Sequence, residues 1–290
     1  MNVYEVVTAR VLKQLEAGVL PWRKTWTTGL PKSLATGREY RGMNLLLLSS
    51  TEFSSGYWLT YREALKLGGH VRKGERATPV VYWKWRTPEE IQRLIQVKGI
   101  ADPAPCVPFT SAVFNLDQVE GVESPATDQP AKPESRLALA EGVLAGMRDA
   151  PAIVHGITQQ PAYQFTLDRV SMPHLGQFEG ADEYYSTLFH EMVHATGHSR
   201  RLNRFAETEG YQDERYSFEE LVAELGAAFL CAFAGLTNPS TEQLQASYIA
   251  GWAKVFRQDS QVLARAASAA QKAVDFIRGT VFEEATSKAA

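Results

Sequence analysis

The pattern H-E-x-x-H at residues 190–194 constrains this chain more than any other feature of its sequence. Positions four apart on a helix lie on one face, about one turn apart, so the imidazoles of His190 and His194 can bind one divalent ion. Glu191 can reach the open coordination position and accept a proton from water there. Gly197 is a natural end for such a helix. The alternative is a histidine-bearing core helix that binds no metal.

A third ligand would favour the metal-binding interpretation, and the nearest candidate is His198. His198 follows the expected helix end, and the longer pattern H-E-x-x-H-x-x-G-x-x-H would need a histidine where Arg200 stands. Residues 216–233 read YSFEELVAELGAAFLCAF, with the apolar spacing of a helix. Ser217 is a candidate N-cap, and Glu220 would complete a capping box three residues later. We therefore expect a second helix whose glutamates are candidate ligands.

Glutamates on this second helix form a pattern of their own. Glu220 and Glu224 are four apart and share one face among small residues. A carboxylate pair on a mostly apolar helix is costly to bury unless a cation or another partner is present. The cost is resolved if one glutamate binds the metal and the other hydrogen-bonds a ligand histidine. The alternative is a solvated acidic face made by Glu219, Glu220 and Glu224, with Glu220 capping the helix.

The two motifs together resemble a known group of enzymes. H-E-x-x-H followed by a helix reading E-x-x-A-x-x-x-A-x-x-L resembles the glutamate-type zinc peptidases, including the phage-repressor-cleaving and SprT-like groups. The match runs through four positions of the second helix: Glu220, Ala223, Ala227 and Leu230. The resemblance implies that His190, His194 and Glu220 bind the metal and that Glu191 is the catalytic general base. Glu224 falls where thermolysin-like enzymes place an acidic residue that orients a histidine ligand. Two histidines and one glutamate suit Zn best, although Mn, Co or Ni would also fit.

Charge is divided unevenly along the sequence. Residues 1–86 contain 14 Lys or Arg and 6 Asp or Glu, a net charge of +8, whereas the remaining residues carry a net charge of −11. Five of the six tryptophans also lie in the first part. A strong local excess of positive charge indicates an anionic partner.

Basic side chains interleaved with aromatic rings suit single-stranded nucleic acid. The cations follow the phosphates, and exposed rings stack on bases of any sequence. The alternative is that the tryptophans are core residues and the charge only keeps the protein in solution. No groove-reading helix or zinc-finger spacing occurs, so we do not expect sequence-specific duplex binding. The candidate contacts are Trp22, Arg23, Lys24, Trp26, Arg38, Arg41, Arg72, Lys73 and Lys84.

Several features bear on where the protein acts. No run of about 18 apolar residues occurs, so we expect no membrane span and no membrane partner. The N-terminus is amphipathic and lacks the basic-then-apolar region of a signal peptide. Cys106 and Cys231 are far apart and imply no disulfide framework. We expect a cytoplasmic protein.

The order of expected elements gives an α+β protein of two domains. Residues 1–115 form the first domain, residues 136–290 form the second, and residues 116–135, rich in Pro, Glu, Asp and Ser, form a linker. Apolar spacing predicts helices over residues 3–17, 61–67, 136–147, 241–256 and 259–278, with Thr60 capping the second. Alternation predicts strands over residues 57–61, 109–115, 153–155 and 162–170, and a hairpin over residues 71–86. Residues 163–170 are the candidate edge strand for an extended peptide.

Several blocks of the first domain resemble a second known family. PWRKTW, SLATGREYRGMNLLLL and WLTYREALKLGGHVRKGERATPVVYW, in this order, resemble the N-terminal domain of ArdC-type antirestriction proteins. A related domain occurs in plasmid primases of conjugative elements. With the metal motif, this resemblance covers nearly the whole sequence. It implies a non-specific single-stranded DNA-binding domain fused to a zincin-like metallopeptidase domain.

The resemblance implies a function, and two alternatives stay open. The leading interpretation is an antirestriction protein of a mobile genetic element that protects incoming DNA from host restriction. Its partners would be single-stranded DNA and a protein substrate or host restriction enzyme. One alternative is a DNA-binding antirestriction factor whose metal site is structural or vestigial. The other is a SprT-like protease that removes proteins bound or crosslinked to DNA.

Overall fold

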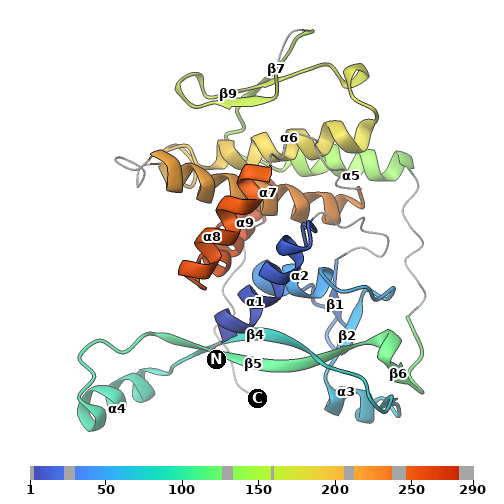
Figure 1. The fold of residues 1–290 in the computed structure, drawn as a ribbon, viewed down its shortest axis with the longest axis vertical. Helices are drawn as coiled ribbons and strands as arrows, with labels where there is room; N and C mark the ends of the chain where they lie inside the picture. Colours follow the sequence, from blue (N-terminus) through green and yellow to red (C-terminus); the bar gives the residue numbers. More distant parts are fainter. Residues whose placement is uncertain are drawn as a thin grey trace.

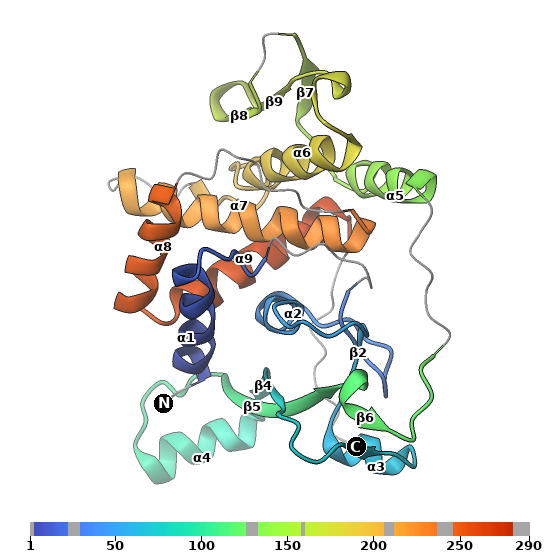
Figure 2. The ribbon, with the colours of Figure 1, turned by 45° about the vertical axis from the view of Figure 1, so that its right-hand side comes forward.

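Helices in the middle of the molecule separate a three-stranded sheet at one end from a four-stranded and a two-stranded sheet at the other (Figure 1). One end is built on a ribbon of two long strands, β4 (Thr78–Trp85) and β5 (Cys106–Asn115). A helix that links these strands, α4 (Pro88–Lys98), projects from the body in both views (Figure 2). This arrangement is the α+β class predicted from the sequence. The computed structural model describes residues 3–22, 30–125, 133–157, 160–205, 212–236 and 246–280.

The larger sheet has the strand order β1-β2-β5-β4, with β1 (Lys32–Ser33) parallel to β2 (Tyr57–Leu59) and the other pairs antiparallel. The expected hairpin over residues 71–86 is wrong. β3 (His70–Val71) pairs with β6 (Val119–Glu120), and β4 pairs with β5. Turn residues indicate where a strand ends but not which strand it pairs with. The partner of β4 is β5, and Val113 of β5 lies in the same core cluster as Val80 of β4.

The remaining short elements of this half follow their local signals. The helix cap predicted at Thr60 is confirmed, because its Oγ1 accepts a hydrogen bond from the N–H of Glu63, whose carboxylate in turn accepts one from Thr60 N–H. These elements are α1 (Val3–Glu16), α2 (Gly42–Ser49), α3 (Tyr61–Lys66) and the 3₁₀ turn η1 (Leu116–Gln118).

Helix α2 connects the large sheet to the helical layer. The side-chain amide of Asn44 hydrogen-bonds both the backbone N–H and the backbone carbonyl oxygen of Val81 in β4, each at 2.7 Å. At the start of α2, the N–H of Gly42 donates to Oε1 of Gln271 at 2.8 Å. Gln271 belongs to α9 (Val262–Ile277), so α2 is hydrogen-bonded to both neighbours.

The helical layer contains one large core. A single cluster of buried apolar side chains takes residues from α1, α2 and all of α5 to α9, so the predicted first and second domains share this core. Trp22, 1% exposed, packs edge-on against Trp252, with 5.6 Å between ring centroids.

No helix of the described residues is long and apolar enough to cross a membrane. The further helices are α5 (Pro133–Ala145), α6 (Ala181–Thr196), α7 (Gln212–Ala234) and α8 (Ala246–Gln258).

The start of α7 differs from the prediction. The helix begins at Gln212, so Ser217 lies inside it and is not an N-cap, and Glu220 is not part of a capping box. The backbone carbonyl oxygen of Ser217 accepts a hydrogen bond from Nε1 of Trp252 at 3.0 Å. Serine favours caps and turns over helix interiors, so the local pattern indicated an N-cap here, whereas the helix continues N-terminally past Ser217.

The small sheet covers α6 and has the order β7-β9-β8. The predictions of one strand over residues 162–170 and of an edge strand over residues 163–170 are wrong, because Phe165–Leu167 form a 3₁₀ turn, η2, and the backbone reverses at Asp168. The second part of the segment becomes the central strand, and only residues 162–164 lie at an edge. The elements are β7 (Ala152–His155), β8 (Ala162–Gln164), β9 (Arg169–Met172) and the 3₁₀ turn η3 (Leu175–Gln177).

Candidate metal centre

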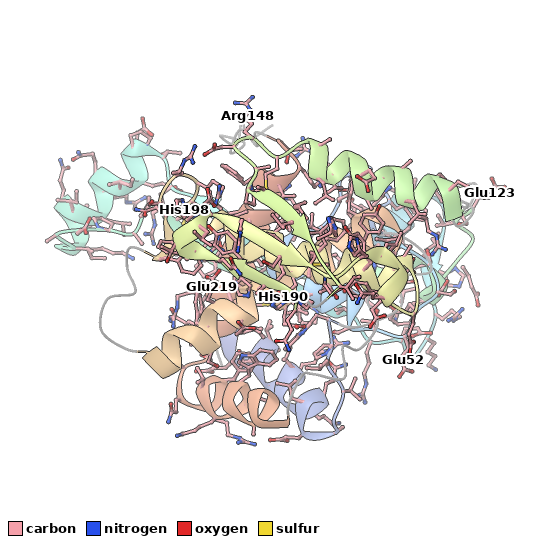
Figure 3. All side chains as sticks on the ribbon, turned by 90° about the horizontal axis from the view of Figure 1, so that it is seen from above. Glu52, Glu123, Arg148, His190, His198 and Glu219 are labelled. Atoms are coloured by element: carbon pink, nitrogen blue, oxygen red, sulfur yellow. The ribbon has the colours of Figure 1, made fainter. Side chains whose placement is uncertain are left out.

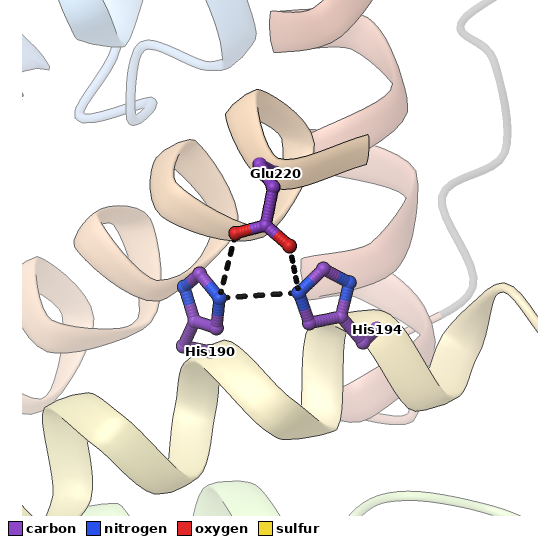
Figure 4. A group of neighbouring side chains, drawn as sticks. All are labelled: His190, His194 and Glu220. Carbon is purple, nitrogen blue, oxygen red and sulfur yellow. Dashed lines mark hydrogen bonds and ion pairs between the residues drawn. The ribbon is translucent and has the colours of Figure 1, made fainter. Parts of the chain in front are cut away.

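Helices α6 and α7 bring three ligand groups together (Figure 4). Nε2 of His190 lies 3.1 Å from Nε2 of His194. The carboxylate of Glu220 lies 3.5 Å from the first of these nitrogens and 3.4 Å from the second. Among the described residues, these three side chains form the group of metal-ligand type, with their ligand atoms within 4.8 Å of one another.

The close approach of the two helices depends on small residues in α7. A Cβ atom on Gly226 would lie 2.7 Å from Cγ2 of Val193 in α6, which is closer than such atoms pack. Ala223 and Ala227 are buried on the same helix. The absence of larger side chains therefore lets α7 carry Glu220 to within reach of both histidines.

Two further glutamates lie near the outer nitrogens of the histidines. The carboxylate of Glu224, which the resemblance predicts to orient a histidine ligand, lies 3.6 Å from Nδ1 of His190, and the carboxylate of Glu219 lies 3.6 Å from Nδ1 of His194. Glu219 and Glu224 are 9% and 8% exposed, so the alternative of a solvated acidic face is wrong. A carboxylate on the outer nitrogen fixes the orientation of a ligand histidine and raises its basicity.

Sequence reasoning missed the role of Glu219 and its partner Arg204. Nη2 and Nε of Arg204 donate to the two oxygens of Glu219 at 2.6 and 3.1 Å, and Arg204 also bonds the C=O of Val193 and the hydroxyl of Thr196 in α6. The position of Glu219 directly before Glu220 was a usable signal. The arginine lies on a loop whose path could not be read from periodicity.

Protonation in the cluster follows from this enclosure. Burial by itself lowers the pKa of His194, but hydrogen bonds with Glu219 and Glu220 outweigh it and raise that pKa to about 10. Burial raises the pKa of Glu220, whereas its bonds with His190 and His194 hold that pKa far below its usual range. The buried carboxylates therefore demand positive charge. Two imidazole nitrogens and one carboxylate oxygen are a donor set that fits a divalent cation such as Zn²⁺.

The predicted general base lies beside the edge strand of the small sheet. Glu191 is buried, and its Oε2 accepts a hydrogen bond from the backbone N–H of Tyr163 in β8 at 2.6 Å. Viewed from above, His190 and Glu219 lie close together beside the strands of this sheet, with His198 farther along (Figure 3). The base, the ligands and the strand edge thus meet at one place.

The other histidines stand apart from the ligand group. Nε2 of His155 lies 2.8 Å from the hydroxyl of Tyr184, and its ring stacks on His174. The ring of His198 packs against Phe165, with 4.9 Å between centroids.

Comparisons with known proteins agree with this geometry. Residues 1–112 match the N-terminal domain of anti-restriction factor ArdC, and residues 143–269 match the zincin-like metallopeptidase family. The Mn(II)-bound crystal structure of the antirestriction protein ArdC from plasmid R388 superposes with a TM-score of 0.77 and 33% identity, over 96% of this protein and 97% of that one. This protein belongs to the ArdC antirestriction family. The metal-free structure of the same ArdC protein gives a TM-score of 0.75.

Two further relatives of this ArdC-family protein have different lengths. The uncharacterized protein y4eC of Sinorhizobium fredii is 33% identical over 288 residues, which are 95% of the present sequence and 91% of that protein. The DNA primase TraC of Escherichia coli is 33% identical over 292 residues, or 94% of the present sequence. The sequence spans only 27% and 20% of the lengths of two such primases.

The nucleic-acid contacts predicted for this ArdC-family protein fall into four groups. Trp22 is a core residue, so the prediction that its ring stacks on bases does not agree with its burial. Arg41 is half-buried and pairs with Asp275 of α9. Arg23, Lys24 and Trp26 lie outside the described residues. Four candidates are exposed: Arg38, Arg72, Lys73 and Lys84.

Two exposed aromatic residues on the ribbon that were not among the predicted contacts stack on each other. Tyr82 in β4 lies opposite Phe109 in β5, and their rings stack with 5.7 Å between centroids and 28° between planes. They are 37% and 49% exposed. Lys84 lies two residues beyond Tyr82 on the same strand face and pairs with Glu90 of α4. Phe109 could have been predicted to lie beside Tyr82 only from the register of β4 with β5, and the sequence did not reveal that these two strands pair.

Proposed function

We propose that this protein is an antirestriction protein of a mobile element that binds single-stranded DNA without sequence preference and cleaves a protein substrate at a metal site. The observation that carries the proposal is the meeting of Glu191 with the ligands His190, His194 and Glu220 beside the open edge of β8. Peptidases of this kind need a metal, a base and a strand edge at one place.

The protein's own residues have distinct roles in the proposed reaction. His190, His194 and Glu220 would hold Zn²⁺ or another divalent ion such as Mn²⁺. When bound, the ion would polarise a peptide carbonyl and lower the pKa of water. Glu191 would take up the proton of the attacking water at its carboxylate and pass it to the leaving amine. The edge of β8 would align an extended peptide by backbone hydrogen bonds.

Single-stranded DNA binding is proposed for the ribbon end of the molecule. The support is the exposed stack of Tyr82 and Phe109 next to Lys84, within a part of the sequence that has a net charge of +8 over residues 1–86. Exposed rings near cations suit bases and phosphates of any sequence. We thus propose residues 1–115 as the DNA-binding part, residues 136–290 as the metal-binding part and residues 116–135 as the connection. Residues 126–132 of this connection lie outside the described residues. Both cysteines are free, which fits the proposed cytoplasmic location.

A proteolysis assay on the full-length protein tests the peptidase proposal. Purified protein loaded with Zn²⁺ or Mn²⁺ is incubated with subunits of a host restriction enzyme, with and without single-stranded DNA. We expect cleavage that a chelator stops and that Glu191→Gln abolishes while metal remains bound. Protection of DNA in cells by Glu191→Gln at the wild-type level would contradict the proposal and favour a structural or vestigial metal. Cleavage of DNA-crosslinked proteins, but not of restriction subunits, would favour the SprT-like alternative.

A further inference from the structure

Arg201 is a fully buried cation just beyond α6. Its side chain is 0% exposed, although that of the neighbouring Arg200 is 63% exposed. A guanidinium has five N–H groups to satisfy, and each of them has an acceptor here. The acceptors are the C=O of Ala195 at 2.6 Å, the C=O of Asp149 at 2.9 Å, the hydroxyl of Tyr163 at 3.1 Å, and Oδ2 at 3.2 Å and Oδ1 of Asp168.

These acceptors belong to three separate segments of the sequence. Ala195 lies in the last turn of α6, Asp149 precedes β7, and the other two flank the turn between β8 and β9. Asp168 itself has a left-handed φ of 45°, which is uncommon for residues other than glycine. A buried ion pair contributes little net stability on average, but it can select one arrangement of the segments that it joins. Arg201 thus fixes the β8 turn on the end of the metal helix.

The fixed segment is the one that reaches the general base. The side chain of Tyr163 is held by Arg201 and Asp168, and its backbone N–H donates to Glu191. Tyr163 lies opposite Val170 of β9, but its backbone N–H donates to Glu191. This N–H therefore points away from β9, toward the open edge of the sheet. A shift of the turn would therefore move the strand edge relative to Glu191.

We propose that Arg201 is a positioning residue that sets the edge strand β8 against Glu191, so that an extended peptide and the base meet in register. The consequence for cleavage rests on the peptidase function proposed above, whereas the geometric role does not. None of the five hydrogen bonds of Arg201 goes to a metal ligand, so its loss should leave the metal in place.

The test compares Arg201→Lys and Arg201→Gln with the matched variant Arg200→Gln in the full-length, metal-loaded protein. Arg200 also lies 3.7 Å from Asp168, but its pair is solvent-exposed and contributes little. Amide hydrogen exchange over residues 160–168, metal content, kcat and KM are measured. In the Arg201 variants we expect faster exchange in that segment and metal content within about twofold of wild type. Because misplacement by about 1 Å can cost 100-fold, we expect kcat/KM to fall by about 10- to 100-fold, mainly through kcat, since the peptide no longer meets the base in register. Lysine should retain more activity than glutamine.

Several results would overturn the role. Unchanged exchange over residues 160–168, metal loss as large as in His194→Ala, or equal effects of the Arg200 variant would each do so. If Arg201→Gln does not fold, Tyr163→Phe removes one of the five hydrogen bonds of Arg201, together with that from the Tyr163 hydroxyl to Asp168, and should still raise exchange in the same segment. If the wild-type protein cleaves no substrate, the peptidase proposal fails, and the exchange measurement still decides the positioning role.

Discussion

Nη2 and Nε of Arg204 donate hydrogen bonds to the two carboxylate oxygens of Glu219 at 2.6 and 3.1 Å. The carboxylate of Glu219 in turn lies 3.6 Å from Nδ1 of His194. The arginine therefore acts on the candidate ligand His194 through one intermediate residue. It contrasts with Arg201, three positions earlier, which hydrogen-bonds Tyr163 of the edge strand. One short loop thus contacts both the candidate metal centre and the edge strand.

The glutamates around the metal site should differ in their effect on metal affinity. Glu220→Ala removes a ligand and should cost the most, whereas Glu224→Ala or Glu219→Ala removes only the partner of a histidine and should cost about 10- to 100-fold. Arg204→Met should behave like Glu219→Ala. Titration with Zn²⁺ against a chelating indicator measures each affinity. A larger loss in Glu224→Ala than in Glu220→Ala would reverse the assigned roles.

Replacement of the histidines separates binding from chemistry. His190→Ala or His194→Ala should remove most of the bound metal, because each supplies a neutral imidazole ligand. Glu191→Gln should retain metal, because Glu191 is not a ligand in the group. Metal analysis after dialysis gives the comparison, and equal metal loss in all three variants would refute it.

Trp22 should act on stability and not on DNA binding. Trp22→Ala leaves a cavity against Trp252 and should lower the free energy of unfolding by about 3–5 kcal/mol. Trp22→Phe should cost less, because the indole nitrogen has no partner among the described residues. Urea denaturation gives the free energies, and fluorescence anisotropy with labelled oligonucleotides gives the affinities. A fall in DNA affinity of Trp22→Phe without loss of stability would restore the stacking role first predicted for it.

Tyr82→Ala and Phe109→Ala should each weaken binding of single-stranded DNA by about 1–3 kcal/mol, because each removes a ring on which a base can stack. Tyr61→Ala is the matched control, since Tyr61 is an exposed aromatic residue on α3. Affinity should fall steeply between about 50 and 200 mM salt, because phosphate contacts release counterions. Insensitivity of binding to both ribbon variants would place the DNA elsewhere.

The two thiols should differ in reactivity. Burial raises the pKa of Cys231 to about 12, so at pH 8 its thiol stays protonated, and the protonated form is not the nucleophile. Cys106 is half-buried in β5. Iodoacetamide should therefore modify one cysteine of the folded protein and both after unfolding, as read by mass spectrometry. Rapid labelling of Cys231 in the native protein would show that the core around α7 opens readily.

Local signals in the sequence predicted much of the metal centre. The four-residue spacing of His190 and His194 depends only on helix geometry, and Glu220 was reached through a family pattern on a second helix. Thr60 capped its helix for the same local reason. For the histidines and for Thr60, the residues that decide the outcome lie within a few positions of one another, whereas Glu220 lies 26 positions beyond His194 and was reached only through the family pattern.

The predictions that failed depended on residues far apart in the sequence. β4 pairs with β5, and Val113 of β5 lies more than thirty positions beyond its partner Thr78. Helix α7 begins earlier than predicted, so Ser217 lies in its interior. Trp22 looked like a base-stacking residue because its neighbours in sequence are basic, whereas its neighbour in space is Trp252. Arg201 and Arg204 act through loops, which have no periodicity to read.

Helix α2 is hydrogen-bonded to β4 through Asn44 and Val81 and to α9 through Gly42 and Gln271, and this connection has a consequence for inheritance. A recombination event within residues 116–135 would give α1 and α2 a foreign set of helices to pack against, with an exposed apolar face wherever the surfaces did not match. The relatives at 33% identity align over 94–96% of the sequence, across both halves. Because both halves contribute to one core, a change on one side of it has to be matched on the other, so the two halves must diverge together.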